Sequence, residues 1–453
     1  MKQTSFYRQN LSLALPMILS FVGQCIVQMA DTIMVGRLGT NQLAAVAFAG
    51  TVTYNAMVVG MGIAMGLTPL VGQFFASGDK ESASRLFENS LSLNTFMSLV
   101  IVALLLGMMP LLQYFGQPKE VIDICKPYYF VVALSFIPQM LFLSFKQFTE
   151  GIGNTKVSMA ITIGANLLNI FLNWVLIYGK FGFPCLGVLG AAIATLIARI
   201  LMPISFIIYM YSHKEMRFYF SLFQKKWLSF YEHVRLLRVG VPIAGQMFVE
   251  FFSLLGITIM MGWKSAADLA AYQIVLTMFS TTFQSANGVS CATTVLVSHA
   301  FGRGDLNELK HHFKAGFIIA LSFMVCFALI FIFLGHYIAC VFSTDSHVIS
   351  IASTFFIVAG FFQIFDGTQV SMLGGLRGIK DVFKPMKYAC ISYVLIAVPL
   401  AYLCGFVLCL GSWSIFAGFM AGLICAALLY YRRFSACVAR YAKEGLPIKN
   451  INQ

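Results

Sequence analysis

The chain has 453 residues, of which 59% are hydrophobic and only 10% are charged. Soluble domains carry about 25% charged residues, so this composition excludes a soluble protein and predicts an integral membrane protein. The formal net charge of +13 comes from 30 Lys and Arg residues that lie mainly between long apolar segments. That distribution does not indicate a nucleic-acid partner.

Twelve apolar segments are long enough to cross a bilayer as tilted helices. The first six cover 9–35, 44–75, 87–113, 122–147, 157–178 and 187–211. The second six cover 233–261, 269–299, 310–335, 346–373, 386–406 and 411–433. We therefore predict an all-α membrane protein with an N-lobe over 1–211, a polar inter-lobe loop over 212–232 and a C-lobe over 233–453 that ends in a short tail.

The two halves repeat each other at a shift of 226 residues. Residues that recur at this shift include helix prolines and loop glycines, with Pro16, Gly36, Gly78 and Asp79 matched by Pro242, Gly262, Gly304 and Asp305. Because each half has six segments, both halves enter the membrane in the same direction. The repeat therefore predicts a pseudo-twofold axis along the membrane normal and a cavity near the bilayer midplane.

Lys and Arg residues divide unequally between the two sides of the predicted membrane protein. The loops and termini on one side hold 24 of them and those on the opposite side hold 5, while Arg199 lies inside a segment. Loops rich in Lys and Arg mark the cytoplasmic side. We therefore expect both termini and the 212–232 loop in the cytoplasm. Because no small-residue cleavage site follows the first ten residues, we expect no removed signal peptide.

Polar residues inside the first-half segments fall on shared helical faces. Asp31 lies about three-quarters of the way along 9–35, with Gln24 on the same face. Asn169 and Asn173 are one turn apart, and Thr195 could complete a polar pocket with them. A charge inside a spanning helix costs about 2.5–3.5 kcal/mol on insertion scales, so it is a functional hypothesis by default. The alternative is ordinary hydrogen bonding between helices.

Two further acids lie inside second-half segments. Glu250 is near the middle of 233–261, and Asp366 lies inside FFQIFDGTQV. Gln273 and Gln284 belong to one continuous polar face of the segment 269–299. Two acids near such faces favour a cation or proton site, and the alternative is a buried structural network.

The sequence lacks the motifs of several enzyme classes. It has no GxxxxGK[ST] loop, no nucleophile elbow and no HExxH, so nothing in it supports an ATPase or a hydrolase. Its eleven cysteines include no CxxC pair and no His/Cys cluster at metal spacing, so we expect neither disulfides nor a metal centre. Its 44 Phe and 23 Met residues can offer adaptable surfaces to varied organic cations.

Several stretches together resemble one known family. They are LALP and QMADTIMVGRLG in the first segment, NIFLNW and GAAIAT between Asn169 and Thr195, Glu250, LAAYQ over 269–273, and FDGTQ with GGLRGIKD over 365–381. Over essentially its full length the chain resembles the multidrug and toxic compound extrusion (MATE) transporters, specifically the NorM-like branch.

The resemblance implies twelve helices in two six-helix lobes, a V-shaped central cavity and export coupled to inward movement of Na⁺ or H⁺. It implies an N-lobe site at Asp31, surrounded by Asn169, Asn173 and Thr195. It also implies a C-lobe cation site at Glu250 and Asp366, with Gln273 as a helper. The acid at Glu250 points toward Na⁺. In similar proteins a tyrosine precedes the second acid by four residues, whereas this chain has Phe362, which removes one hydroxyl ligand and leaves the choice of cation open.

The leading interpretation is a secondary active antiporter that exports amphipathic organic cations. We expect a monomer in the plasma (inner) membrane, in contact with lipids and with no cofactor besides the coupling ion. One alternative is a MATE-like flippase for a lipid-linked saccharide, which should hold pyrophosphate with several cationic residues where this chain offers little beyond Arg199. Another is a membrane-embedded enzyme that uses Glu250 and Asp366 as acid and base.

Overall fold

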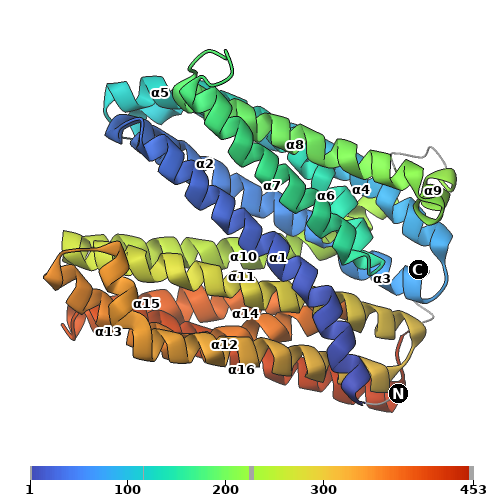
Figure 1. The fold of residues 1–453 in the computed structure, drawn as a ribbon. Coiled ribbons are helices and arrows are strands. Elements are labelled where there is room, and N and C mark those ends of the chain that lie inside the picture. The colour runs from blue at the N-terminus through green and yellow to red at the C-terminus, as the bar shows by residue number, and fades with distance from the viewer. Residues whose placement is uncertain (1–2, 116, 224–228, 448–453) are drawn as a thin grey trace. The chain divides into compact units, whose positions relative to one another are not determined.

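The computed structural model describes residues 3–115, 117–223 and 229–447, which form helices joined by short connections with no β-strand among them (Figure 1). The helices before the middle loop, and the short helix within it, are α1 (Gln3–Gly36), α2 (Thr40–Met65), α3 (Leu67–Ala76), α4 (Lys80–Met108), η1 (Met109–Tyr114), α5 (Lys119–Leu134), α6 (Phe136–Gly151), α7 (Thr155–Tyr178), α8 (Gly187–Ser212) and α9 (Lys214–Ser221). The later helices are α10 (Phe230–Lys264), α11 (Ala266–Arg303), α12 (Leu306–Phe342), α13 (Ser346–Gly378), α14 (Phe383–Ala389), η2 (Cys390–Ala397), α15 (Val398–Tyr402), η3 (Leu403–Val407) and α16 (Ser412–Glu444).

Each of the twelve predicted segments is present as one long helix or as helices joined end to end, which confirms the all-α membrane fold. The eleventh segment is continuous through α14, η2, α15 and η3, of which η2 and η3 are π-helical. Within the described chain, eleven helical segments are long and apolar enough to cross a membrane. The remaining segment is α11, whose exposed face carries polar side chains such as Gln273, Thr277 and Ser280.

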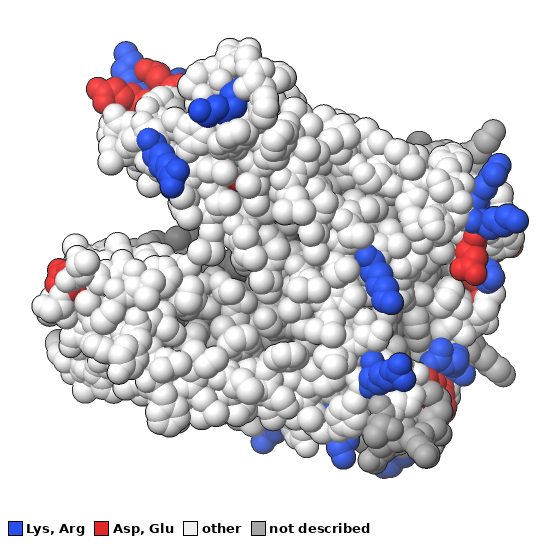
Figure 2. Space-filling view, viewed as in Figure 1, with Lys and Arg blue, Asp and Glu red and all other residues white. Residues whose placement is uncertain are grey.

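The surfaces of the helices suit contact with lipid. On the face shown in Figure 2, charged side chains lie mostly near helix ends, and the surface between them is largely uncharged. Large apolar side chains such as Leu104, Phe333 and Leu395 are 64%, 73% and 67% exposed. Apolar side chains that are exposed to this extent suit contact with lipid. Helices suit the same environment because the backbone of each helix satisfies its own hydrogen bonds.

The described residues divide into two compact units, and two helices belong to both. The N-terminal unit comprises Leu19–Ala244, and the C-terminal unit comprises Met1–Ile18 with Gly245–Gln453. The division therefore falls inside α1 and α10. Pro16 and Pro242, the repeated prolines, lie just before the two positions where the chain passes from one unit to the other. A proline removes one backbone hydrogen bond from a helix interior and favours a bend there.

In the N-terminal unit, close contact between α7 and α8 brings their polar faces together. A Cβ atom added to Gly190 of α8 would lie 2.6 Å from the carbonyl oxygen of Leu176 on α7. Glycine is therefore required where these two backbones approach. The approach positions Asn169 and Asn173 of α7 beside Thr195 of α8.

In the C-terminal unit, α13 packs against α11, α12 and α16. Ser290 Oγ on α11 donates to the carbonyl oxygen of Val370 at 2.7 Å, and Thr294 Oγ1 donates to that of Gly374 at 3.0 Å. A Cβ atom on Gly374 would lie 2.7 Å from the Ser290 carbonyl oxygen. These contacts fix α13, and with it Asp366, at the centre of the unit.

Candidate functional site

The N-terminal unit assembles the four polar residues that the sequence predicted for it. Asn173 donates through its Nδ2 to Asp31 Oδ1, and also to Asn169 Oδ1 at 3.2 Å. Asn169 Nδ2 lies 3.4 Å from Thr195 Oγ1. If the Asn169 amide is turned over, its nitrogen donates to Asp31 Oδ1 at 3.3 Å instead. Three helices, α1, α7 and α8, thus contribute to one polar cluster around a carboxylate.

Arg199 is a charged neighbour of Asp31 that the sequence left without a role. It lies one turn after Thr195 on α8, and its Nη1 donates to Ser135 Oγ at 2.7 Å. Its guanidinium also stands 5.8 Å from the centre of the Phe136 ring. Arg199 therefore faces the interior of the unit, where it contacts Ser135 and Phe136. The sequence did offer one sign of this role, because Arg199 is a charged residue inside the predicted segment 187–211.

In the C-terminal unit, Glu250 is joined to a buried arginine through an amide. Gln246 Nε2 donates to Glu250 Oε2 at 2.9 Å, and Arg377 Nη2 donates to Gln246 Oε1 at 2.7 Å. Arg377 is only 8% exposed. It belongs to α13, whereas the charge count had assigned it to a cytoplasmic loop. Sequence reasoning therefore missed Arg377 as part of this site.

Asp366 is 1% exposed, and neither of its carboxylate oxygens accepts a hydrogen bond from any residue that the structure describes. The carboxylate of Glu250 is its charged neighbour. Buried polar groups are almost always paired, and an isolated buried charge is very costly. The described residues therefore leave Asp366 without the partner that a buried carboxylate requires.

Gln363, one turn before Asp366, presents another unpaired oxygen. The Thr282 hydroxyl donates to the carbonyl of Phe279 at 2.8 Å, so it must accept from Gln363 Nε2 at 2.6 Å. That bond orients the amide and leaves Gln363 Oε1 buried without a partner in the described chain. Gln363 and Asp366 lie on the same face of α13 because they are three residues apart. Together they provide three oxygen atoms of the type that hard cations prefer.

Tyr393 supplies a hydroxyl group near Glu250. It lies in η2, and its hydroxyl donates to Gln369 Oε1 at 2.7 Å. Both Tyr393 and Gln369 are polar neighbours of Glu250. Phe362 is fully buried and stacks on Phe416 with ring centres 5.0 Å apart. Phe362 thus packs among aromatic rings, and the hydroxyl group near Glu250 belongs to Tyr393 on another helix.

Gln273 and Gln284 lie apart from this arrangement. Gln273 is exposed, and the residues of its turn that face the core are Tyr272 and Val275. Gln284 is half-buried on the same face of α11. The roles of these two side chains as cation helper and pocket residue stay predictions.

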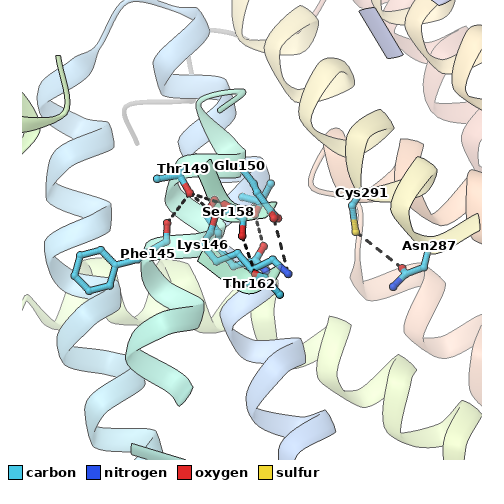
Figure 3. A network of polar contacts seen from close by, with 10 residues as sticks. Phe145, Lys146, Thr149, Glu150, Ser158, Thr162, Asn287 and Cys291 are labelled. Carbon is cyan, nitrogen blue, oxygen red and sulfur yellow. Dashed lines mark hydrogen bonds and ion pairs between the residues drawn. The ribbon is translucent and has the colours of Figure 1, made fainter. Parts of the chain in front are cut away.

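A buried ion pair between Lys146 and Glu150 lies in the N-terminal unit (Figure 3). Lys146 Nζ is 3.9 Å from Glu150 Oε1 on the same helix, and both side chains are about 5% exposed. The ammonium group also stands 4.8 Å from the centre of the Phe21 ring. Thr149 and Ser158 hydrogen-bond beside the pair at 3.0 Å between their hydroxyl oxygens. Lys146 lies within the predicted segment 122–147 and on α6, where Glu150 is its counter-ion.

Comparisons with known proteins agree with the repeat and with the resemblance. A sequence model of the MatE family matches residues 16–175 and 242–403, so the two matches begin at the repeated prolines. A probable multidrug resistance protein NorM of Rhizobium meliloti is 31% identical over 443 residues, which are 96% of this chain and 94% of that protein. One of the same name from Agrobacterium fabrum is 29% identical over 445 residues, 97% of this chain and 96% of that protein.

Solved structures share the fold at lower sequence identity. A MOP superfamily transporter from Pyrococcus furiosus aligns with a TM-score of 0.89 and 19% identity over 97% of each chain. A MATE transporter of Vibrio cholerae, solved as a mutant, aligns with a TM-score of 0.88 and 17% identity over 97% of this chain and 98% of its own. The chain therefore belongs to the MatE family as a NorM-like, multi-pass membrane transporter, and it is not an enzyme.

Proposed function

We propose that the protein is a secondary active multidrug efflux antiporter, which exports amphipathic organic cations in exchange for Na⁺ or H⁺. The names of its relatives describe multidrug resistance, which supports drug export. The proposal includes a monomeric protein in the plasma (inner) membrane with both termini in the cytoplasm. The division of Lys and Arg between the two sides supports that orientation.

One observation carries the proposed ion coupling. Asp366 and Gln363 present three buried oxygen atoms that have no partner in the described chain, beside the second acid, Glu250. A monovalent cation bound there would neutralise a carboxylate and fill the coordination that the protein leaves open. A proton on Asp366 would remove the same charge, so Na⁺ and H⁺ compete for one site.

The inward ion gradient then provides the energy for export. A cation that binds from outside neutralises the acids and favours one conformation of the transporter, and its release to the cytoplasm restores the charge that attracts the organic cation. A ligand shifts such an equilibrium only through its different affinity for the two conformations. Each charge that enters gains about 2.3 kcal/mol per 100 mV of membrane potential.

Asp31 gives the N-terminal unit a separate proposed role in coupling or in substrate binding. Its carboxylate is held by Asn173 and lies beside Asn169. These amides, with Thr195, present the mixture of donors and acceptors that a polar part of a drug requires. Unlike Asp366, Asp31 has hydrogen-bond donors within the chain, which supports a smaller dependence on an external cation.

Export of ethidium from proteoliposomes tests the proposal. We expect faster transport under a Na⁺ gradient directed against the dye, and loss of that increment in Glu250→Gln and Asp366→Asn. Glu444→Gln, a change of an exposed acid on α16, is the matched control and should keep the increment. If transport follows a pH gradient and ignores Na⁺, the coupling ion is the proton. If neither gradient drives transport, the antiporter proposal is wrong.

A further inference from the structure

Arg377 places a permanent positive charge beside Gln246, the amide that donates to Glu250 of the proposed cation site. Its side chain is buried on α13 and donates through Nη2 to Gln246 Oε1 at 2.7 Å. An arginine side chain stays protonated in proteins, so this charge cannot be removed during transport. Among the described residues, Arg377 is the cationic neighbour of Glu250.

Gln246 transmits the position of Arg377 to the carboxylate. Because its Oε1 accepts from Arg377, its Nε2 must point away from the arginine, and it donates to Glu250 Oε2 at 2.9 Å. Gln246 is 3% exposed, so water does not compete freely for these bonds. The arginine therefore both orients the amide and compensates the charge of Glu250.

We infer that Arg377 is a built-in counter-ion that limits the C-terminal site to one coupling cation in each transport cycle. This inference rests on the proposed antiport. Two ionised carboxylates, Glu250 and Asp366, and one guanidinium leave a net charge of minus one. A single Na⁺ or H⁺ makes the site neutral. A second cation would leave an uncompensated positive charge in a poorly hydrated environment, which is strongly unfavourable.

The same count predicts that transport of a singly charged drug is electrically silent. One coupling cation enters and one organic cation leaves, so no net charge crosses the membrane. The N-terminal unit fits this count because the charges of Asp31 and Arg199, one negative and one positive, add up to zero. The site that lacks a complete set of internal counter-ions is the one at Glu250 and Asp366.

Two substitutions of Arg377 distinguish the effect of its charge from the effect of its side-chain shape. Arg377→Gln removes the charge, and Arg377→Lys keeps it but changes the shape. We expect wild-type protein and Arg377→Lys to bind one Na⁺ per molecule with a Hill coefficient of about one, whereas Arg377→Gln should bind two with a coefficient that rises toward about two. Binding of ²²Na⁺ to purified protein measures both quantities. Arg432→Gln, a change of an exposed arginine on α16, controls for loss of a positive charge elsewhere.

The electrical readout uses ethidium transport in proteoliposomes with and without a potassium diffusion potential. The Na⁺ gradient sets the direction of transport, so that Na⁺ moves into the vesicle and the dye moves out. An inside-negative potential should leave wild-type transport unchanged and should accelerate Arg377→Gln, because two positive charges then enter for each one that leaves. If protons are the coupling ion, the same comparison is made with a pH gradient, and the count is of protons carried per dye molecule.

Two results would overturn the inference. One is a coupling ratio of two in the wild-type protein, which can be measured even if Arg377→Gln does not fold. The other is a folded, active Arg377→Gln that still exchanges one cation for one dye molecule and ignores the potential. Failure of antiport itself looks different, because then no ion gradient drives the dye in wild-type protein, whatever the state of Arg377.

Discussion

Gln363 and Asp366 lie one turn apart on α13 and leave three buried oxygen atoms without a hydrogen bond from the described chain. The orientation of the Gln363 amide follows from the Thr282 hydroxyl, which has already donated its proton to the carbonyl of Phe279. A buried acceptor that has lost its water costs about 1–3 kcal/mol when unpaired, and a charged one costs more. A cation bound at the proposed site would recover this local cost.

Sodium should therefore stabilise the protein through Asp366. At a Na⁺ concentration ten times the dissociation constant, binding to the folded state adds about 1.4 kcal/mol. We expect the apparent melting temperature of detergent-purified protein to rise with NaCl but not with choline chloride. Asp366→Asn should abolish this rise without lowering the melting temperature in Na⁺-free buffer, because it removes an unpaired buried carboxylate. A rise of equal size in the variant would show that Na⁺ binds elsewhere.

Gln363 should contribute to Na⁺ affinity through its unpaired oxygen. Gln363→Leu removes that oxygen and should raise the Na⁺ concentration for half-maximal transport about tenfold, which corresponds to about 1.4 kcal/mol. Thr282→Val is the matched comparison, since it removes the hydrogen bond that orients the amide but keeps the Gln363 oxygen in the chain, so it should cause a smaller loss. An equal loss in both variants would mean that Gln363 acts by holding α13 against α11 rather than by binding the cation.

The sequence predicted the N-terminal cluster well because its geometry is local. Asn169 and Asn173 are one helical turn apart, so their sharing of a face follows from the period of the helix. Thr195 joins them because α7 and α8 are consecutive helices, and consecutive elements usually pack side by side. The contact with Asp31 on α1 needed the tertiary fold, and the resemblance to a known family provided it.

The C-terminal site was only partly predictable for physical reasons. The helix α13 ends at Gly378, five residues beyond the predicted end of its apolar segment at 373, so Arg377 was counted as a loop residue. Hydropathy cannot tell a helix that ends from one that continues with a buried charge. Tyr393 was missed for two reasons. No polar residue stands one turn away from it in its apolar segment to mark a polar face, and its π-helical turn does not follow the usual helical period.

Topology can be tested by labelling single cysteines in a Cys-free background. Ser346 is exposed at the start of α13, where we expect the outer side, and Ser221 is exposed at the end of α9, where we expect the cytoplasm. An impermeant maleimide should label Ser346→Cys in intact cells and Ser221→Cys only after lysis. The reverse pattern would invert the topology.

The charge of Asp31 should be needed for transport although its shape is not. Asp31→Asn keeps the size of the side chain and can still accept a hydrogen bond from Asn173, so expression and folding should stay close to wild type. The variant leaves Arg199 without its nearby negative charge, which makes the interior of the N-terminal unit positive and repels an organic cation. We expect at least a tenfold loss of ethidium export in cells that lack other pumps, a loss that corresponds to about 1.4 kcal/mol.

Asp123→Asn, a change of an exposed acid on α5 of the same unit, is the matched control and should export normally. Double replacement of Asp31 by Asn and of Arg199 by Gln should recover part of the export, because it restores neutrality without restoring either charge. Full export by Asp31→Asn alone would show that Asp31 only ties α1 to α7.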